Sequence, residues 1–232
     1  MRLSTFIVSS KDIYEDKIIL NEDINHLKNV LRLKTGNKVR VVDGQKEYLC
    51  IIENLEKSQA ILNILETKNE EEPKGKVTAA ISLIKSQNFS TIVKELTELG
   101  ISNLIPLYTN RTVIQDFNIE KWNKISKEAL KQCGGINFMN IFNPQKLNEL
   151  DLSSYDLKVL AYEKEKDYKI LNLLKEHQFN NPIFIIGPEG GFDEEEVIFL
   201  KQKNFLSVSL GKRILRAETA SILLGGILVN GL

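Results

Sequence analysis

Residues 77–107 read VTAAISLIKSQNFSTIVKELTELGISNLIPL and contain a complete strand–helix–strand unit. The apolar run Val77–Ile84 is typical of a strand that is buried on both faces. Apolar residues then recur at helical spacing until Gly100, and a second apolar run follows at Leu104–Leu107. Two strands joined by a helix in this order predict a parallel βαβ unit.

The same alternation continues to the end of the sequence. The expected helices cover residues 119–132, 168–177 and 193–203 and a last segment from Ala217, and the expected strands cover residues 157–162, 183–187 and 206–210. Strands that alternate with helices predict an α/β domain with a mostly parallel sheet.

The residues before this region follow a different pattern. Residues 1–66 contain three stretches of period-two alternation typical of strands, at Val39/Val41, Tyr48/Cys50/Ile52 and Ala60/Leu62/Ile64. A hairpin turn is expected at Asp43-Gly44. One helix is expected to interrupt the strands, capped by Asp23 and with one apolar face formed by Ile24, Leu27, Val30 and Leu31. Short strands and one helix predict a small β-barrel.

A polar segment separates the two patterns. Residues 67–76, TKNEEEPKGK, contain an acidic run, a proline and a glycine but no apolar side chain, as expected of a solvated linker. The sequence therefore predicts a first domain of residues 1–72 and a second of residues 73–232.

Composition excludes several classes of protein. Hydrophobic residues make up 42% and charged residues 27%, which excludes a mainly disordered chain. The 31 basic residues balance 31 acidic ones, so any attraction to nucleic acid must come from local clusters. Residues 26–46 contain six basic residues and a single acidic one, Asp43. This basic cluster forms either a solvated surface or an RNA phosphate contact.

Metal, disulfide and membrane chemistry have little support. Cys50 and Cys133 cannot make a disulfide framework, and a reducing, cytoplasmic setting is expected. His26 and His177 lie in different domains without neighbours at ligand spacing, so we expect no metal. The apolar stretch Ser221–Val229 is about half a membrane span, and we expect no membrane segment.

Ligands of open parallel sheets bind beyond the carboxyl ends of the strands, here the loops after Tyr162, Gly187 and Leu210. The loop Gly187–Phe192, GPEGGF, lets bare backbone approach a ligand or another chain segment. It lacks the pattern of a phosphate loop and of a dinucleotide fingerprint. Glu189 within it either caps neighbouring amides or has a functional role.

The loop after Leu210 reads GKRILRAET over residues 211–219. Arg213 and Arg216 are three residues apart and either project to one side or pair with nearby acids such as Glu218. The helix that follows is apolar nearly all round and contains Gly225-Gly226, which indicates a subunit interface or a tightly threaded chain.

Four segments together resemble the RsmE family, the ribosomal RNA small-subunit uridine N3-methyltransferases of the SPOUT class. They are His26–Gly44 (HLKNVLRLKTGNKVRVVDG), residues 98–111 with Glu98-Leu99-Gly100, Ile105-Pro106-Leu107 and Arg111, Gly187–Phe192 (GPEGGF) and Leu210–Ala220 (LGKRILRAETA). The chain departs from the family pattern at residues 132–135 and 137–140, where the usual arginines are absent.

The resemblance implies a PUA-like RNA-binding barrel followed by a SPOUT-like domain with a C-terminal trefoil knot. It implies a homodimer that binds S-adenosylmethionine and acts on small-subunit (16S) ribosomal RNA, free or within the assembled 30S subunit. The implied cofactor-binding residues are Ala161, Tyr162, Ile186, Gly187, Pro188, Glu189, Gly190, Gly191, Ser209, Leu210, Gly211, Ile214 and Leu215. The expected RNA-binding residues are Lys28, Arg32, Lys38, Arg40, Arg111 and Arg213.

Methylation of a uridine nitrogen needs a base, a cation and alignment. We expect Arg216 to stabilise the uridine anion or orient the base, with Glu189, Glu218 or water as proton acceptor. Two alternatives stay open: ribose 2′-O-methylation on the same knotted scaffold, and a non-catalytic ribosomal-RNA-binding or assembly protein.

Overall fold

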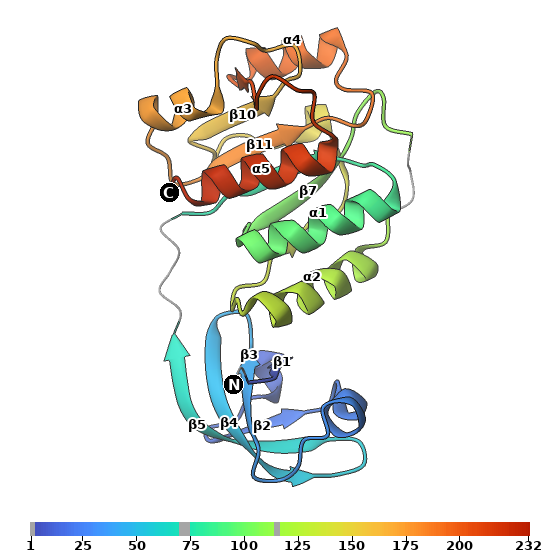
Figure 1. Cartoon of the computed structure of the whole chain (residues 1–232), viewed down its shortest axis with the longest axis vertical. Coiled ribbons are helices and arrows are strands. Elements are labelled where there is room, and N and C mark those ends of the chain that lie inside the picture. Colours follow the sequence, from blue (N-terminus) through green and yellow to red (C-terminus); the bar gives the residue numbers. More distant parts are fainter. Residues whose placement is uncertain (1–2, 70–74, 114–116) are drawn as a thin grey trace. The chain divides into compact units, whose positions relative to one another are not determined.

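The computed structural model of the chain describes residues 3–69, 75–113 and 117–232 and forms two compact units (Figure 1). The first comprises Met1–Glu72 with Leu130–Phe138, and the second comprises Pro73–Ala129 with Met139–Leu232. The sequence division at residues 72 and 73 does not include the segment 130–138 in the first unit. That segment joins it because Leu130 and its apolar neighbours pack against side chains of the first sheet.

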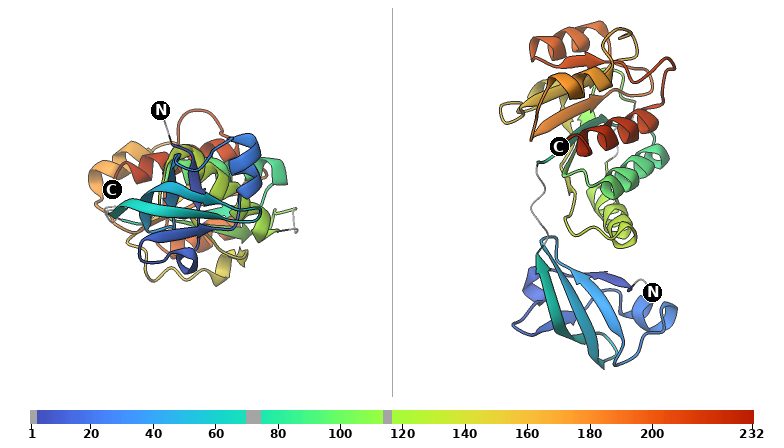
Figure 2. Two further views of the ribbon diagram at one scale, coloured as in Figure 1. Left: turned by 90° about the horizontal axis from the view of Figure 1, so that it is seen from below. Right: turned by 60° about the vertical axis from the view of Figure 1, so that its left-hand side comes forward.

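A five-stranded sheet of order β1-β3-β4-β5-β2 forms the first unit. Its strands are β1 (Thr5–Ile7), β2 (Lys17–Leu20), β3 (Lys38–Val42), β4 (Lys46–Leu55) and β5 (Ala60–Asn69). All pairs are antiparallel except β1 with β3. The sheet curls around its core, as Figure 2 shows, with β1 and β2 at its two edges. The first unit is thus a curled half-barrel, and β1 and β2 are strands that the sequence analysis did not predict.

The hairpin expected at Asp43-Gly44 joins β3 to β4. Gly44 adopts a φ of +95°, a value that favours glycine, and the Asp43 carboxylate accepts the main-chain N–H groups of Gln45 and Lys46 at 2.8 and 2.7 Å. The turn forms because its side chain and its glycine satisfy the backbone locally.

The helix expected after Asp23 is wound differently from the prediction. Residues His26–Val30 form a π-helix, in which Leu31 N–H bonds to His26 O at 2.9 Å. Leu27 is fully buried but Val30 is 63% exposed, because the wider winding turns it away from the core. Asp23 is not a side-chain cap; its backbone is left-handed, and its carboxylate forms an ion pair with Lys131 at 2.6 Å.

A parallel sheet of order β12-β10-β11-β6-β7-β8, with β9 also paired to β7, forms the second unit. Its strands are β6 (Thr78–Ser82), β7 (Asn103–Tyr108), β8 (Asn140–Ile141), β9 (Gln145–Lys146), β10 (Leu157–Ala161), β11 (Pro182–Ile186) and β12 (Leu206–Val208). The helices are α1 (Ser86–Leu99), α2 (Ile119–Cys133), α3 (Ile170–Glu176), α4 (Glu194–Gln202) and α5 (Ala217–Val229). The expected α/β domain is confirmed; the short strands β8 and β9 were not predicted.

Helices cover both faces of this sheet, as Figure 1 shows. In β11, Phe184 and Ile186 belong to the core shared with α1 and α5, whereas Ile183 and Ile185 belong to the core shared with α4. Alternate residues of one strand therefore pack on opposite faces. This two-sided burial is the reason why the strands read as continuous apolar runs.

Helix α5 packs closely on neighbouring apolar side chains at Gly225. A Cβ atom there would lie 3.1 Å from Leu96 Cδ2 and 3.3 Å from Ile101 Cδ1, and both of these side chains are buried. At Gly226 the nearest atom to such a Cβ would be Leu99 Cδ2, at an ordinary 3.5 Å.

Alanine substitutions at the two glycines should therefore differ in sign. Gly226→Ala should stabilise the protein by about 0.5–1 kcal/mol, because alanine loses less backbone entropy than glycine in a helix. Gly225→Ala should give no gain or a loss, because buried side chains would have to move. Urea denaturation of the full chain measures both variants, and equal stabilisation by both would contradict this packing.

Candidate functional site

Three loops of the second unit lie side by side at one edge of the sheet. Strand β10 pairs with β11 on one side and β12 on the other, with Leu160 opposite Ile185 and Ala161 opposite Val208. Because all three strands are parallel, their carboxyl ends lie at the same edge. The loops that follow Ala161, Ile186 and Val208 are those in which the sequence analysis placed a ligand.

The glycine loop, residues 187–192, is shaped by its glycines and by Phe192. A Cβ on Gly187 would lie 3.1 Å from the ring of Phe192, which is buried in the core beneath α4. Gly191 has a φ of +69°, and its N–H bonds to Pro188 O at 2.9 Å. A Cβ on Gly191 would also lie 3.0 Å from Glu163 Oε1, so this loop closely approaches the loop after β10. A larger residue fits neither position without strain or displacement.

The loop after β12 is anchored at its start and exposed further along. Ser209 exchanges main-chain hydrogen bonds with the segment before α3, through Tyr168 O at 2.8 Å and Ile170 N at 3.3 Å. Gly211 has a φ of +137° and open space around it. Ile214 is 82% exposed, so an apolar side chain faces solvent beside bare backbone.

The charged candidates of these loops are available to a ligand. Glu189, Arg213 and Arg216 are exposed, and over the residues that the structure describes their side chains have no hydrogen bond or ion pair. Arg216 directly precedes α5, where its carbonyl accepts Ala220 N–H at 2.9 Å. Glu218 is half-buried in the first turn of the same helix.

A fourth loop, which follows β7, forms a compact turn at Thr109–Thr112. Thr109 N–H donates to Thr112 Oγ1 at 3.0 Å, and Thr112 N–H donates to Thr109 O at 2.9 Å. The two hydroxyl oxygens lie 2.8 Å apart, and Thr109 Oγ1 also lies 3.4 Å from Ser82 Oγ in β6. Hydroxyl and main-chain bonds together fix the shape of this turn.

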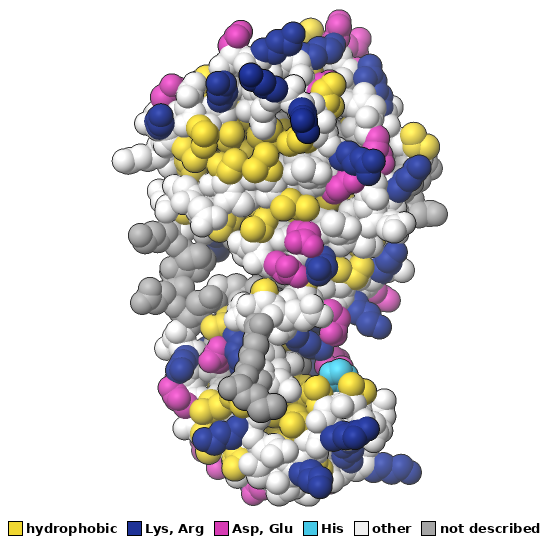
Figure 3. All heavy atoms as spheres, viewed as in Figure 1, with side chains coloured by type: hydrophobic (Ala, Val, Ile, Leu, Met, Phe, Trp, Pro, Cys, Tyr) yellow, Lys and Arg dark blue, Asp and Glu magenta, His cyan; other side chains and the backbone are white. Residues whose placement is uncertain are grey.

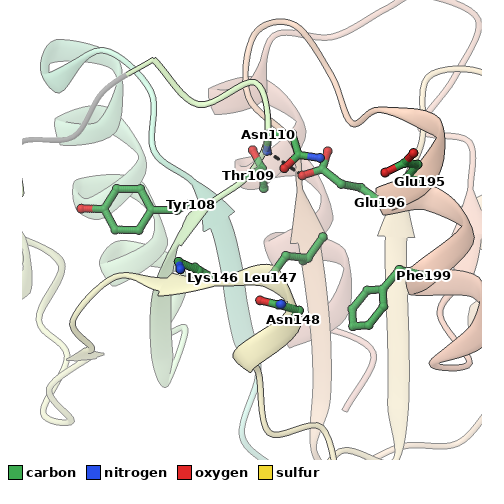
Figure 4. Close-up of a pocket in the computed structure, with 9 residues that line it drawn as sticks. All are labelled: Tyr108, Thr109, Asn110, Lys146, Leu147, Asn148, Glu195, Glu196 and Phe199. Carbon is green, nitrogen blue, oxygen red and sulfur yellow. Dashed lines mark hydrogen bonds between the residues drawn. The ribbon is translucent and has the colours of Figure 1, made fainter.

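This turn contacts the glycine loop and the start of α4. Arg111 Nη1 donates to Gly190 O at 2.6 Å, and Asn110 Nδ2 donates to Asp193 Oδ2 at 2.6 Å. Asn110 N–H donates to Glu196 Oε1 at 2.7 Å, an interaction drawn in Figure 4. Asp193 caps α4 by accepting Glu196 N–H at 2.8 Å. The sequence analysis had placed Asp193 inside the helix expected at residues 193–203, whereas the structure places it at the N-cap.

A pocket of about 440 Å³ lies beside these contacts. As Figure 4 shows, it is bordered by the end of β7, the segment after β9 and the first turns of α4. Its lining residues are Tyr108, Thr109, Asn110, Lys146, Leu147, Asn148, Glu195, Glu196 and Phe199. None of the residues expected to bind the cofactor is among them. Sequence analysis missed the pocket because its lining comes from three separate segments; only the Thr-x-x-Thr pattern after β7 signals the turn.

The cations expected to bind RNA differ in their exposure and in their partners within the protein. Arg40 is turned inward: its side chain is 13% exposed, lies 2.6 Å from Glu47 and donates to the carbonyls of Gly134 and Gly135 at 3.0 and 3.1 Å. Lys28 donates to the carbonyl of Glu56. Arg32 and Lys38 are exposed, and Arg32 has a φ of +53°. The geometry gives Arg40 a structural role, because it ties residues 134 and 135 to the sheet.

Two negative findings apply to the described residues. Over residues 3–69, 75–113 and 117–232, no three potential metal ligands of the His, Cys, Asp or Glu type gather in one group. Within the same residues, no helix has the length and hydropathy needed to cross a membrane.

The pKa of Asp193 makes the cap pH-dependent. Hydrogen bonds from Glu196 N–H and from the Asn110 amide stabilise the carboxylate and lower its pKa below the ordinary 3.8. The ionised Asp193 carboxylate therefore contributes its full stabilisation at pH values above the ordinary pKa of 3.8. This stabilisation is lost as the pH falls through the lowered pKa. Asp193→Asn should destabilise the protein most near neutral pH, and the difference should shrink in acid below pH 3.8.

Denaturant midpoints recorded across the pH range measure this difference. Glu194→Gln is the control, because it removes a charge from the same turn without touching Asn110. A constant deficit of Asp193→Asn at every pH would show that the charge has no role in the cap.

Comparison with known proteins places the chain in a family. A family model described as an RNA methyltransferase domain matches residues 70–229, and one described as an RNA methyltransferase PUA domain matches residues 19–65. Ribosomal RNA small subunit methyltransferase E of Mesomycoplasma hyopneumoniae is 32% identical over 219 residues, covering 89% of this chain and 91% of that protein. The Rickettsia conorii protein of the same name is 31% identical over 227 residues, covering 96% and 93%.

A solved structure agrees. A putative methyltransferase of Legionella pneumophila, in complex with the bound cofactor S-adenosylmethionine, has 26% identity and a TM-score of 0.84, covering 98% of this chain and 97% of that one. The motifs of the two glycine-bearing loops, the parallel sheet that brings them together and the matches along nearly the whole sequence agree with one another. The chain belongs to the ribosomal RNA small subunit methyltransferase E family.

Proposed function

We propose that this protein transfers a methyl group from S-adenosylmethionine to N3 of a uridine in small-subunit ribosomal RNA. The observation that carries the proposal is the meeting of the loops after β10, β11 and β12 at one sheet edge, in a chain of this family. The names of the relatives supply the substrate class, and the Legionella pneumophila structure supplies the cofactor.

The residues at this edge fit such a cofactor. Gly211 has open space beside its main chain, and the exposed Ile214 with the half-buried Leu215 offers an apolar surface for an adenine ring. We therefore keep Ala161–Tyr162, Ile186–Gly191, Ser209–Gly211 and Ile214–Leu215 as the residues that hold the cofactor. When bound, S-adenosylmethionine supplies an electrophilic methyl group on a sulfonium.

Residues of this chain would prepare the uridine for transfer. N3 must lose its imide proton, and the resulting negative charge spreads over the two carbonyl oxygens. The Arg216 guanidinium offers a planar pair of donors to that charge or to the base. Glu189 in the glycine loop and Glu218 in the first turn of α5 are alternative proton acceptors, with water as a third.

We also propose that the active protein is a homodimer and that its C-terminal segment forms the family's trefoil knot. Figure 3 shows hydrophobic side chains gathered over α5, where Leu223 is 39% exposed and Ile222 and Ile227 are half-buried. An apolar surface of this kind favours association with a second copy. A cytoplasmic location stays a prediction.

For the first unit we propose RNA binding. The match of residues 19–65 to the PUA domain of RNA methyltransferases supports this role. Of the four cations expected to bind RNA in this unit, Arg32 and Lys38 are exposed, and Arg213 is a further candidate on the second unit.

Labelled S-adenosylmethionine incubated with small-subunit particles from cells that lack the enzyme tests the proposal. Nucleoside digestion and mass spectrometry should find the label on uridine N3. Label on the ribose would instead establish 2′-O-methylation. Cofactor binding without label on any ribosomal RNA, free or assembled, would favour the non-catalytic alternative.

Arg216→Ala should separate binding from chemistry. We expect the Kd for S-adenosylmethionine, measured by calorimetry, to stay within about twofold, because main-chain groups provide most of the contacts. Single-turnover methyl transfer should fall by about 100-fold or more, the loss typical of removing a donor that stabilises developing charge. Normal turnover would exclude Arg216 from the mechanism.

RNA affinity should depend on Arg32 but not in the same way on Arg40. Arg32→Ala should weaken binding to a ribosomal RNA fragment and reduce the slope of log K against log salt by about 1. Arg40→Ala should mainly lower stability, because it leaves Glu47 and two carbonyls without their partner. Filter binding across a salt series and thermal melting distinguish the two, and a flat salt response of the native protein would reject phosphate contact.

A further inference from the structure

We propose that the turn Thr109–Thr112 positions the glycine loop for cofactor binding, with Arg111 and Asn110 as positioning residues. This inference rests on the proposed function and adds a fourth loop to the three that hold the cofactor. The sequence analysis expected Arg111 to contact RNA, and its contacts in the structure favour a different role.

Hydrogen bonds within the turn and to strand β6 fix the turn Thr109–Thr112 in place. Its two threonines bond to each other through both main chain and side chain, and Thr109 is only 9% exposed. Ser82, at the end of β6, is fully buried and lies within hydrogen-bond distance of Thr109. Because these bonds join two neighbouring strands, the two residues between the threonines have a fixed place relative to the sheet.

Arg111 and Asn110, the two residues between the threonines, hold the glycine loop on both sides of Gly191. Before it, the Arg111 guanidinium donates to Gly190 O at 2.6 Å. After it, the Asn110 amide donates to Asp193 Oδ2 at 2.6 Å. The alkyl part of Arg111 also covers Gly190, since its Cδ would lie 3.4 Å from a Cβ on that glycine.

Glu196 completes the attachment from beneath. Glu196 is 6% exposed, and its carboxylate accepts Asn110 N–H at 2.7 Å through one oxygen and Asp193 N–H at 3.0 Å through the other. One buried carboxylate thus joins the turn to the end of the glycine loop. Each partner in this arrangement is satisfied only while the turn and the loop keep their present relation.

The glycine loop needs such support because its residues restrict it little. Three glycines in six residues give the unattached loop many conformations, and binding a ligand would have to order them. A loop already held in place loses less conformational entropy when the ligand binds. We therefore expect the turn to raise cofactor affinity without touching the cofactor.

An arginine whose role is to bind RNA would have a guanidinium group without partners in its own chain. Arg111 donates to a carbonyl of its own chain and lies near the Asp193 carboxylate, which it helps to keep ionised. Contact with an RNA phosphate would compete with both interactions. The geometry thus favours positioning over RNA contact, and the experiment separates the two.

Arg111→Met, Arg111→Lys and Asn110→Ala test the proposal in the full-length protein without RNA. Arg111→Met keeps the alkyl cover but removes the donor, and should raise the calorimetric Kd for S-adenosylmethionine by about tenfold. Arg111→Lys retains one donor and should restore part of the affinity. Lys124→Met, which removes an exposed cation from α2, is the control and should bind as the native protein does.

Hydrogen exchange of a peptide spanning residues 187–192 gives a readout that needs no cofactor. Exchange should be faster in Arg111→Met and Asn110→Ala than in the native protein and in Lys124→Met, while the melting temperature changes little. In methyl transfer, KM for S-adenosylmethionine should rise more than kcat falls.

The possible failures are distinguishable. If the native protein binds no S-adenosylmethionine, the proposed function fails, and the exchange data still decide whether the turn positions the loop. Native exchange and native cofactor affinity in Arg111→Met, with weakened RNA binding, would overturn the proposal in favour of RNA contact. An equal loss of stability and affinity in Arg111→Met and Arg111→Lys would reduce the residue to a structural role.

Discussion

Main-chain pairing of β10 with both β11 and β12 decides where the chemistry of this protein can occur. The three strands are separated in sequence by helices and loops, yet their parallel hydrogen bonding aligns their carboxyl ends. The alternating apolar residues of β11 hold the sheet between two helical layers, so this edge cannot shift without loss of burial on both faces. The glycine loops can therefore adopt open conformations, because the strands that carry them are fixed.

Buried residues around the site have a different role from exposed ones. Glu196 and Thr109 are buried and bonded, and they set the shape of the loops. Arg216, Glu189 and Ile214 are exposed and unengaged among the described residues, as groups that meet a ligand should be. This division separates residues that build the site from those proposed to act on the substrate.

The same distinction applies to the basic cluster of the first unit. Arg40 and Arg32 lie eight residues apart and look equivalent in the sequence. Tertiary packing gives Arg40 a carboxylate and two carbonyls, whereas Arg32 remains in solvent. A count of cations therefore overestimates the number available to RNA, because an ion pair formed within the fold satisfies the charge.

The sequence by itself determined the βαβ alternation, the helix end at Gly100 and the hairpin at Asp43-Gly44, because each depends on local periodicity or on a glycine with positive φ. Its motifs also indicated the family. Only the tertiary structure decided the π-winding at His26–Val30, the place of residues 130–138 in the first unit and the contacts of Arg111 with Gly190. Those features arise from side chains that meet across long sequence separations, where packing and hydrogen bonding outweigh local preference.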